Sequence, residues 1–298
     1  MQSLASRLVA LAIVLRGSKR RFSSADLTRR QIARLQLNPA RFAPPQRLFR
    51  GLDVTVSTRS GWPVYQIAPR GLDSRRRAIY LHGGAYVYEI VAQHWQLIAD
   101  LARSTDTRFI VPIYPLAPSA TASAIVPAVA DLAEELIRDV GAENLSILGD
   151  SAGGGMALAV ALQLRDRGAP PLRATVLVSP WLDISGTDPA LAVIAPRDPW
   201  LAVPGSHAAG EIYRGELSED DPIVSPIHGD LAGLGPVTMF SGTRDILNAD
   251  ARRLVRLAGQ VGMTVDYHEQ PEMIHVYPLL PIPEAKTARA VIRAAITR

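Results

Sequence analysis

One ten-residue stretch, Leu145–Gly154, constrains the fold of this 298-residue chain more than any other. It begins with apolar residues, turns at a glycine, presents Ser151 and continues into a sequence typical of a helix. Gly149 and Gly153 flank the serine two positions away on each side, as a sharp strand-to-helix turn requires because larger Cβ atoms would collide. Such a turn lifts the serine Oγ out of the sheet and directs the N–H of Ala152 toward any oxyanion formed there. The alternative is a glycine-rich connection without chemistry, as in nucleotide-binding loops.

The composition restricts the chemistry that is open to the chain. There is no cysteine, which excludes a disulfide framework, thiolate catalysis and cysteine-based metal sites. The net charge of +4 comes from arginines scattered along the sequence, and the basic runs at 19–21 and 75–77 lack the interleaved aromatic residues of a nucleic-acid surface. We therefore expect no nucleic-acid partner, and the lack of cysteine favours the cytoplasm.

The apolar run Leu8–Leu15 is too short to cross a bilayer, which takes about 20 residues. It does not have the form of a signal peptide, because its basic cluster follows the apolar residues and no small-residue cleavage site comes after it. We expect a cytoplasmic protein without an integral membrane segment, while peripheral membrane association stays open.

The first 45 residues predict two helices that precede the first strand. The leucines at positions 4, 8, 11 and 15 recur at helical spacing, and a second, weakly amphipathic stretch follows them. Prolines at 39, 44 and 45 end this pattern. Residues 1–45 are therefore expected to form an appendage of a larger domain that spans 46–298.

From Ala78 onward, short apolar strands alternate with helices, which is the pattern of βαβ units in a mostly parallel sheet with helices on both faces. Before them, residues 52–57 and 63–68 alternate around a turn and predict a hairpin at an antiparallel edge. The predicted strands are Ala78–Leu81, Arg108–Val111, Leu145–Leu148, Ala174–Ser179, Val237–Ser241 and Thr264–Glu269. The predicted helices are Ala92–Ser104, Ala122–Val140, Ala152–Arg167 and Ala249–Val261. The expected class is α/β.

Nearly sixty residues separate the strand ending at Ser179 from the strand beginning at Val237, far more than a simple connection needs. This segment must contain additional structure, including a helix near Pro204–Tyr213. Long insertions of this kind are often lids or binding elements. We expect a cap insertion at about 185–225.

In an open parallel sheet, functional groups gather beyond the carboxyl ends of the strands. After the first predicted parallel strand comes His82-Gly83-Gly84, whose glycines allow backbone N–H groups to face a ligand. Asp245 follows the fifth, and His275 lies in the loop after the last. The thirty positions between them equal one helix plus one strand, so both should end at the same edge. The order Ser, Asp, His is that of a catalytic triad on this scaffold.

Some of these residues have plainer interpretations. Asp245 also suits the cap of a helix that begins near Asn248. His268 falls within a strand and His94 within a helix, where packing is a more frequent role than proton transfer. His82 is expected to brace its loop by hydrogen bonding. No spacing of His, Asp and Glu matches a metal site, so no metal is expected.

These motifs resemble those of the bacterial hormone-sensitive-lipase-like esterases, a branch of the α/β-hydrolases with H-G-G-G and G-D-S-A-G signatures. The resemblance covers about Ala78 to the C-terminus and includes Tyr114–Pro118 and Ser179–Asp183, which are similar to the family's Y-R-L-A-P and S-P-W-L-D. It implies an α/β-hydrolase fold with a helical cap made from N-terminal helices and an inserted segment. Ala85 departs from the pattern, since it stands in the place of the third glycine.

Carried over residue by residue, the resemblance implies that Ser151 is the nucleophile, His275 the base and Asp245 its orienting partner. The N–H groups expected to form the oxyanion hole are those of Gly83, Gly84 and Ala152. The candidate residues of the substrate pocket are Tyr86, Asp150, Trp181 and Trp200.

The expected function is the hydrolysis of short- to medium-chain carboxylic esters through an acyl-enzyme intermediate, without a cofactor. The same residues suit an amidase or deacetylase, because the sequence does not report the leaving group. A small-molecule receptor is a further alternative, as in the gibberellin receptors, which resemble this family but lack its histidine. The expected partner is a small ester, and formation of a homodimer stays open.

The leucine face of the first helix needs an apolar surface to cover. The nearest surface implied by the sequence is the acyl pocket beside Ser151, roofed by the insertion near Trp200. We therefore expect the four leucines to pack there and to shape the acyl-binding wall.

Overall fold

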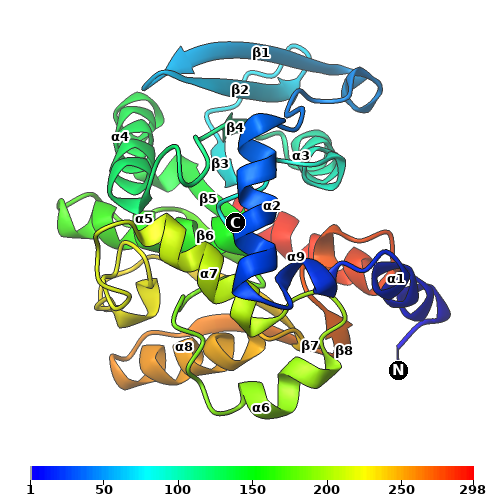
Figure 1. Cartoon of the computed structure of the whole chain (residues 1–298). Coiled ribbons are helices and arrows are strands. Elements are labelled where there is room, and N and C mark those ends of the chain that lie inside the picture. Colours follow the sequence, from blue (N-terminus) through cyan, green and yellow to red (C-terminus); the bar gives the residue numbers. More distant parts are fainter. Residues whose placement is uncertain (1) are drawn as a thin grey trace.

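The computed structural model describes residues 2–298. Eight strands form one sheet in the order β1-β2-β4-β3-β5-β6-β7-β8 (Figure 1). The strands β3 to β8 are mutually parallel, whereas β1 pairs antiparallel with β2 and β2 antiparallel with β4. The bounds are β1 Leu52–Arg59, β2 Trp62–Pro69, β3 Arg77–Leu81, β4 Arg108–Pro112, β5 Leu145–Asp150, β6 Ala174–Val178, β7 Val237–Arg244 and β8 Val265–Ile274. The predicted fold class and edge hairpin are confirmed.

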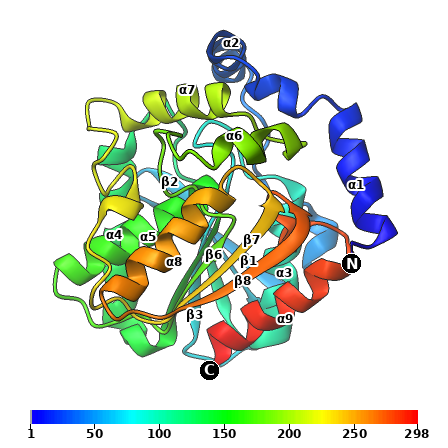
Figure 2. The same ribbon diagram turned by 90° about the horizontal axis from the view of Figure 1, so that it is seen from below.

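Helices cover both faces of the sheet. In Figure 2, α4, α5 and α8 lie on one side of the strands, and α3 and α9 lie on the other. Their bounds are α3 Ala92–Thr105, α4 Ala122–Val140, α5 Ala152–Asp166, α8 Asn248–Gln260 and α9 Pro283–Thr297. The sequence analysis missed α9, because most residues of its buried face, such as Ala285 and Ala288, are alanines that give a weak apolar signal.

The central strand β5 is buried at every one of its six positions. It lies between β3 and β6 in the parallel part of the sheet, where helices cover both faces. A strand in this position reads as a continuous apolar run instead of an alternating one. This explains why the approach to Ser151 was recognisable from the sequence.

Three further helices lie together above the carboxyl-terminal edge of the parallel strands (Figure 2). They are α2 Ala25–Leu37, α6 Leu191–Ile194 and α7 Val203–Arg214. α2 packs against α7, where Arg29 Nη2 donates to Glu211 Oε2 at 2.8 Å. Gly205 makes the close approach to the N-terminal segment feasible, since a Cβ there would lie 2.4 Å from the Cα of Phe22. The N-terminal segment and the insertion therefore meet over the ends of the strands.

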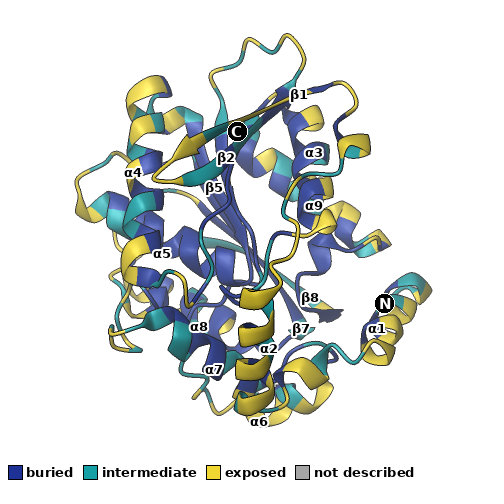
Figure 3. Ribbon diagram, turned by 45° about the horizontal axis from the view of Figure 1, so that its top comes forward, coloured by how far each residue is buried: buried dark blue, intermediate teal, exposed yellow. Residues whose placement is uncertain are grey.

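The packing of α1 (Leu4–Leu15) is the reverse of the expected one. Its four leucines, at positions 4, 8, 11 and 15, are 53–78% exposed, and its buried residues are Ser6, Ala10 and Ile13. Ala10 and Ile13 join the core on the α9 side of the sheet, and Figure 3 shows exposed residues on the side of α1 turned away from the molecule. The prediction that the leucines cover the pocket beside Ser151 is wrong, because the hydroxyls of Ser3 and Ser6 bond to Glu284 of α9 and hold the opposite face against the body.

None of the helices formed by residues 2–298 combines the length and the apolarity that crossing a membrane would need.

Candidate active site

Ser151 stands between β5 and α5 with φ 53° and ψ −122°, a backbone conformation that costs energy for any residue with a side chain. The neighbouring glycines are required by contact. A Cβ on Gly149 would lie 2.0 Å from the carbonyl oxygen of Gly153, and a Cβ on Gly153 would lie 2.1 Å from that of Leu81. The predicted strand-to-helix turn is confirmed, and its strain holds the serine above the sheet.

A chain of two hydrogen bonds joins Ser151 to His275 and Asp245. His275 Nε2 lies 2.9 Å from Ser151 Oγ, and His275 Nδ1 lies 2.9 Å from Asp245 Oδ2. In the neutral imidazole that fits these contacts, the serine hydroxyl donates to Nε2 and Nδ1–H donates to the carboxylate. All three side chains are buried. The structure therefore brings together the three residues that the sequence singled out.

The adjacent strands β7 and β8 position the histidine and the aspartate. Arg244 and Ile274, the residues just before Asp245 and His275, are paired across these strands. β8 extends to Ile274, beyond the predicted end at Glu269, so His275 follows the strand directly. The expectation that both residues reach the same edge is confirmed by this pairing.

Asp245 also makes a hydrogen bond to the backbone just before α8 begins. Its Oδ1 accepts a hydrogen bond from the N–H of Leu247 at 3.0 Å, while its Oδ2 faces the imidazole of His275. The N-cap residue of α8 is Leu247, and no side chain caps this helix end, so Asp245 does not cap the helix and instead closes the turn just before it. The backbone contact fixes the direction in which Oδ2 points.

The electrostatic surroundings of His275 favour its protonated form. Burial alone would lower the pKa of this imidazole, but the Asp245 carboxylate hydrogen-bonded to it, with Asp198 and Asp150 farther away, raises the pKa above its ordinary value. A base with a raised pKa accepts a proton more readily from a serine hydroxyl. The arrangement is suited to a histidine that holds a proton during a reaction.

The sequence analysis missed Asp198, a buried carboxylate of the inserted segment. Its Oδ1 accepts from the N–H groups of Trp200 at 2.7 Å and Leu201 at 2.9 Å, and its Oδ2 accepts from that of Ile246 at 2.9 Å. Burial and the charge of Asp245 raise the pKa of Asp198 to about 6. Asp198 thus connects the insertion to the loop of the triad aspartate.

Trp200 lies over the imidazole as a result of this connection. Its ring stands edge-on to His275, with ring centroids 5.8 Å apart and planes at 87°. The hydrogen bond from the backbone N–H of Trp200 to Asp198 holds the backbone of Trp200 in place for this contact. Of the predicted pocket residues, Trp200 places its ring against that of His275, and Trp181 donates its backbone N–H to the carbonyl oxygen of Ser151 at 2.9 Å.

The predicted oxyanion loop requires a correction. The N–H of Gly83 donates to Asp150 Oδ1 at 3.1 Å, so it is not available to a substrate oxygen. Within residues 2–298, the N–H groups of Gly84, Ala85 and Ala152 have no acceptor. The loop lies against Ser151, since a Cβ on Gly83 would lie 3.0 Å from the Cβ of Ser151. The free donors therefore begin one residue later than the sequence analysis expected.

The sequence analysis placed Asp150 among the candidate residues of the substrate pocket. In the structure its carboxylate lies behind the loop of Gly83. Its Oδ1 accepts from the hydroxyl of Tyr80 at 2.7 Å, and its Oδ2 lies 3.2 Å from His94 Nε2. Burial alone would raise the pKa of Asp150, but His94 and the hydrogen bonds from Tyr80 and Gly83 hold it below its usual value. Both oxygens of the Asp150 carboxylate thus have hydrogen-bond partners, which a buried charge needs to offset its desolvation.

His82 also acts on the loop from within the core. Its Nδ1 lies 2.8 Å from the carbonyl oxygen of Gly83, and its ring stacks on Tyr114 with centroids 4.5 Å apart. Burial, with a smaller contribution from His94, lowers the pKa of His82 to about 4. A neutral histidine in this place braces the loop, as the sequence predicted.

Aromatic side chains gather beside the start of α5. Tyr86 stacks on Trp181, with centroids 5.6 Å apart, and on Tyr213 of α7. A Cβ on Gly155 would lie 3.1 Å from the hydroxyl oxygen of Tyr86, so these rings reach the first turn of the helix. Tyr213 was not anticipated, because the sequence gives no signal for which residue of an inserted helix turns inward.

The sequence and the fold are similar to those of known proteins. The profile of a family described as alpha/beta hydrolase fold matches residues 78–279. A triacylglycerol lipase of Mycobacterium tuberculosis is 34% identical over 241 residues, which are 80% of this chain and 50% of the lipase. The chain thus spans half the length of that relative. An acetyl-hydrolase of Streptomyces hygroscopicus is 33% identical over 211 residues, which are 69% of this chain and 71% of the relative.

Among solved structures, a crystal structure of an esterase from the bacterial hormone-sensitive lipase family matches with a TM-score of 0.83 and 28% identity. The match covers 100% of this chain and 98% of the esterase. The likeness extends over the N-terminal helices and the insertion as well as the sheet.

Proposed function

The chain belongs to the alpha/beta hydrolase fold family, in the bacterial hormone-sensitive-lipase-like branch that its motifs predicted, and from this premise we propose that it hydrolyses carboxylic esters. The observation that carries the proposal is the buried chain of hydrogen bonds from Ser151 through His275 to Asp245. A serine has no nucleophilic strength at neutral pH until such a base removes its proton. Backbone strain and the burial of an imidazole and a carboxylate all cost stability, and the removal of the serine proton accounts for all three.

In the proposed mechanism, Ser151 Oγ attacks the ester carbonyl while His275 Nε2 takes the hydroxyl proton. The Asp245 carboxylate stabilises the imidazolium and keeps Nδ1–H directed toward itself. His275 then donates the proton to the leaving alcohol, and an acyl-enzyme remains. Water activated by the same histidine hydrolyses this intermediate and regenerates the serine.

The oxyanion of the tetrahedral intermediate would be held by the backbone N–H groups of Gly84, Ala85 and Ala152. Support for this assignment comes from their lack of acceptors within residues 2–298 and from the place of Ala152 at the positive end of α5. Donors fixed in the backbone need no rearrangement when the charge develops. The engagement of Gly83 by Asp150 keeps the loop in position for this task.

Residues 1–45 were expected to form cap helices, and we further propose that α2 of this segment and the insertion at about 185–225 form a cap over a pocket for short- to medium-chain acyl groups, while α1 packs beside α9. The contact of α2 with α7 above the strand ends supports this division. The buried ring stack of Tyr86, Trp181 and Tyr213 beside α5 supports a bounded acyl site. Esters are preferred over amides in this proposal because an alcohol leaves with less assistance. A location in the cytoplasm stays a prediction.

The test is active-site labelling followed by a substrate panel. A p-nitrophenyl alkylphosphonate should add its mass to the peptide that contains Ser151, and p-nitrophenyl esters of two to eight carbons should turn over fastest in a series up to sixteen carbons. A chain that remains unlabelled under conditions that label a known serine esterase would support the receptor alternative. A labelled chain that cleaves only p-nitroanilides would point to an amidase.

A further inference from the structure

Helix α1 presents its most apolar face to the solvent. Leu4, Leu8, Leu11 and Leu15 are 72, 56, 53 and 78% exposed, and Val14 beside them is 53% exposed. At 100° per residue, the four leucines fall within a sector of about 60° that points directly away from the buried Ile13. A continuous exposed apolar face of this kind marks an interaction surface.

Specific contacts hold α1 in this orientation. The Glu284 carboxylate of α9 accepts hydrogen bonds from Ser3 N at 2.7 Å, Ser3 Oγ at 2.9 Å and Ser6 Oγ at 3.3 Å. Just after the helix, Lys19 Nζ donates to the carbonyl oxygens of Ala195 at 2.6 Å and Asp198 at 2.8 Å. Both ends of the segment are therefore attached to the body. The helix is fixed with its leucines outward and cannot turn them onto its own core without breaking these bonds.

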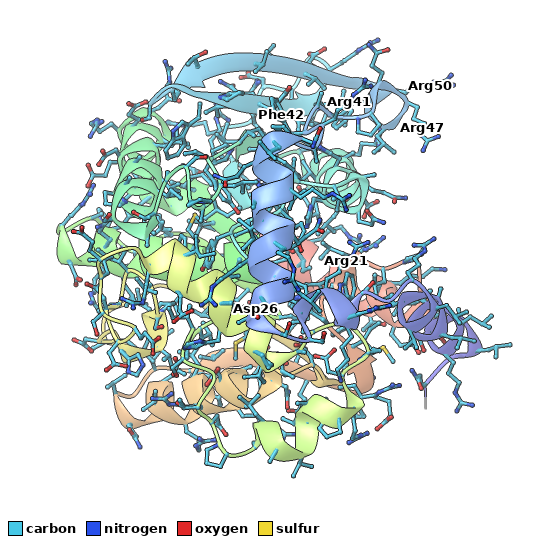
Figure 4. All side chains as sticks on the ribbon, in the orientation of Figure 1. Arg21, Asp26, Arg41, Phe42, Arg47 and Arg50 are labelled. Carbon is cyan, nitrogen blue, oxygen red and sulfur yellow. The ribbon has the colours of Figure 1, made fainter. Side chains whose placement is uncertain are left out.

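The charge of this part of the chain is strongly positive. Residues 1–50 contain eleven of the 32 Lys and Arg residues and one of the 28 Asp and Glu residues. Their net charge is therefore +10, whereas the remainder of the chain carries −6 and the whole carries +4. In Figure 4, Arg47 and Arg50 project on the side of the molecule where α1 lies, and Arg21 lies between α1 and α2.

The arginines next to α1 are not neutralised by the protein. Arg7 and Arg16 belong to the helix and its end, and Arg20 and Arg21 follow in the next turn, all four exposed. Within residues 2–298, none of them lies within 4.0 Å of a carboxylate oxygen. A helix that lies in a membrane interface typically combines an apolar face with flanking arginines of this kind.

We propose that α1 docks this protein onto the surface of a bilayer that contains anionic lipids, with its leucines among the acyl chains and its arginines at the headgroups. A second copy of the chain suits the face less well. In a twofold dimer the same patch meets itself, so that Arg7 and Arg16 of both copies would approach one another. Anionic headgroups, by contrast, attract the basic segment and leave room for the leucines. The proposal concerns binding and does not depend on the reaction at Ser151.

The experiment is sedimentation of the full chain with sucrose-loaded vesicles. Vesicles of phosphatidylcholine with one quarter phosphatidylglycerol should carry the protein into the pellet at least tenfold more strongly than phosphatidylcholine alone, and 0.5 M salt should reduce the difference. Leu8→Glu should weaken binding to the anionic vesicles about tenfold or more. The matched control is Val261→Glu at the end of α8, an equally charged change at an exposed aliphatic residue far from α1.

A second pair of variants separates charge from apolar contact. Arg16→Gln should weaken binding to anionic vesicles and leave binding to phosphatidylcholine unchanged, while Arg256→Gln on α8 should change neither. Circular dichroism melting shows whether each variant is folded. The proposal is overturned if the native chain stays in the supernatant with anionic vesicles, or if Leu8→Glu and Val261→Glu bind alike. A native dimer in analytical ultracentrifugation that Leu8→Glu converts to a monomer would overturn it in favour of a second copy.

Discussion

The surroundings of Ser151 and the helix α1 differ in which side chains they bury. Beneath and beside the serine, the side chains of Asp150, Asp245 and His275 are buried, and each has hydrogen-bond partners. Along α1, four leucines are exposed while Ser6 is buried. One region removes charged groups from water, and the other leaves apolar groups in it.

Each arrangement lowers the stability of the fold, which suggests that each has a function. A buried carboxylate is tolerated only where hydrogen bonds compensate its desolvation, and around Ser151 those bonds fix the positions of the serine, the histidine and the loop of Gly84. An exposed apolar face gains nothing in water and is explained by a surface that it meets. The comparison therefore separates the proposed catalytic site from the proposed attachment surface, and each can be tested by substitution.

The largest effect is expected at the centre of the polar region. Ser151→Ala should lower ester turnover by about 10⁴ to 10⁶ without unfolding the protein, because it removes the nucleophile and leaves the backbone turn unchanged. Ser146→Ala is a matched control, since Ser146 is buried in β5, the strand that leads to Ser151, and its hydroxyl has no partner within residues 2–298. Stopped assays with p-nitrophenyl butyrate measure both. A tenth of the native rate in Ser151→Ala would show that another residue is the nucleophile.

The next largest effect concerns the partner of the histidine. Asp245→Asn should lower kcat by about 10⁴, because the amide favours the wrong imidazole tautomer and no longer stabilises the imidazolium. His268→Ala is the control, since His268 lies on the neighbouring strand and stacks on Phe240 away from the serine. If His268→Ala were as inactive as His275→Ala, the choice of the base would be wrong.

The pH profile should show a smaller but specific change. His275 must be neutral to accept a proton, so kcat/KM should rise with pH, with a midpoint above the ordinary value of about 6.5 because nearby carboxylates raise the pKa of this residue. Asp198→Asn removes one of these charges and should move the midpoint to lower pH, by several tenths of a unit at most. The control is Asp188→Asn, which changes a half-buried carboxylate of the same insertion that does not contribute to the raised pKa of His275. Identical midpoints in the native protein and Asp198→Asn would contradict this influence.

The turn and the strands could be predicted because single residues there are dictated by contact, and the proximity of Ser151, Asp245 and His275 followed from the strand ends at which they lie. Gly149 and Gly153 have no room for a side chain, and β5 is apolar because both of its faces are covered. The sequence could not show which N–H groups of the loop after His82 are free, since this depends on which of them donates a hydrogen bond to the Asp150 carboxylate. The role of Asp198 was equally inaccessible, because it reaches the triad loop from 47 positions away in the sequence.

The helical period of α1 was readable, but its orientation was not. Apolar spacing establishes that a helix has a distinct face, yet the choice of the buried face depends on what the rest of the fold offers. Here α9 offers Glu284, whose carboxylate pairs with Ser3 and Ser6, and small residues allow the helices to approach. The expectation that the most apolar face of a helix packs inward fails for α1, whose buried residues are Ser6, Ala10 and Ile13.

The smallest expected effect tests this orientation directly. Ile13→Ala should lower the free energy of unfolding by about 2 kcal/mol or more, because Ile13 is buried in the core on the α9 side of the sheet and truncation leaves a cavity. Leu8→Ala, five positions earlier on the same helix, should change it by less than about 0.5 kcal/mol, since its side chain is already mostly in water. Urea denaturation followed by tryptophan fluorescence measures both. Equal losses, or a larger loss for Leu8→Ala, would mean that the leucine face is buried in solution and that α1 packs as its apolar pattern alone suggests.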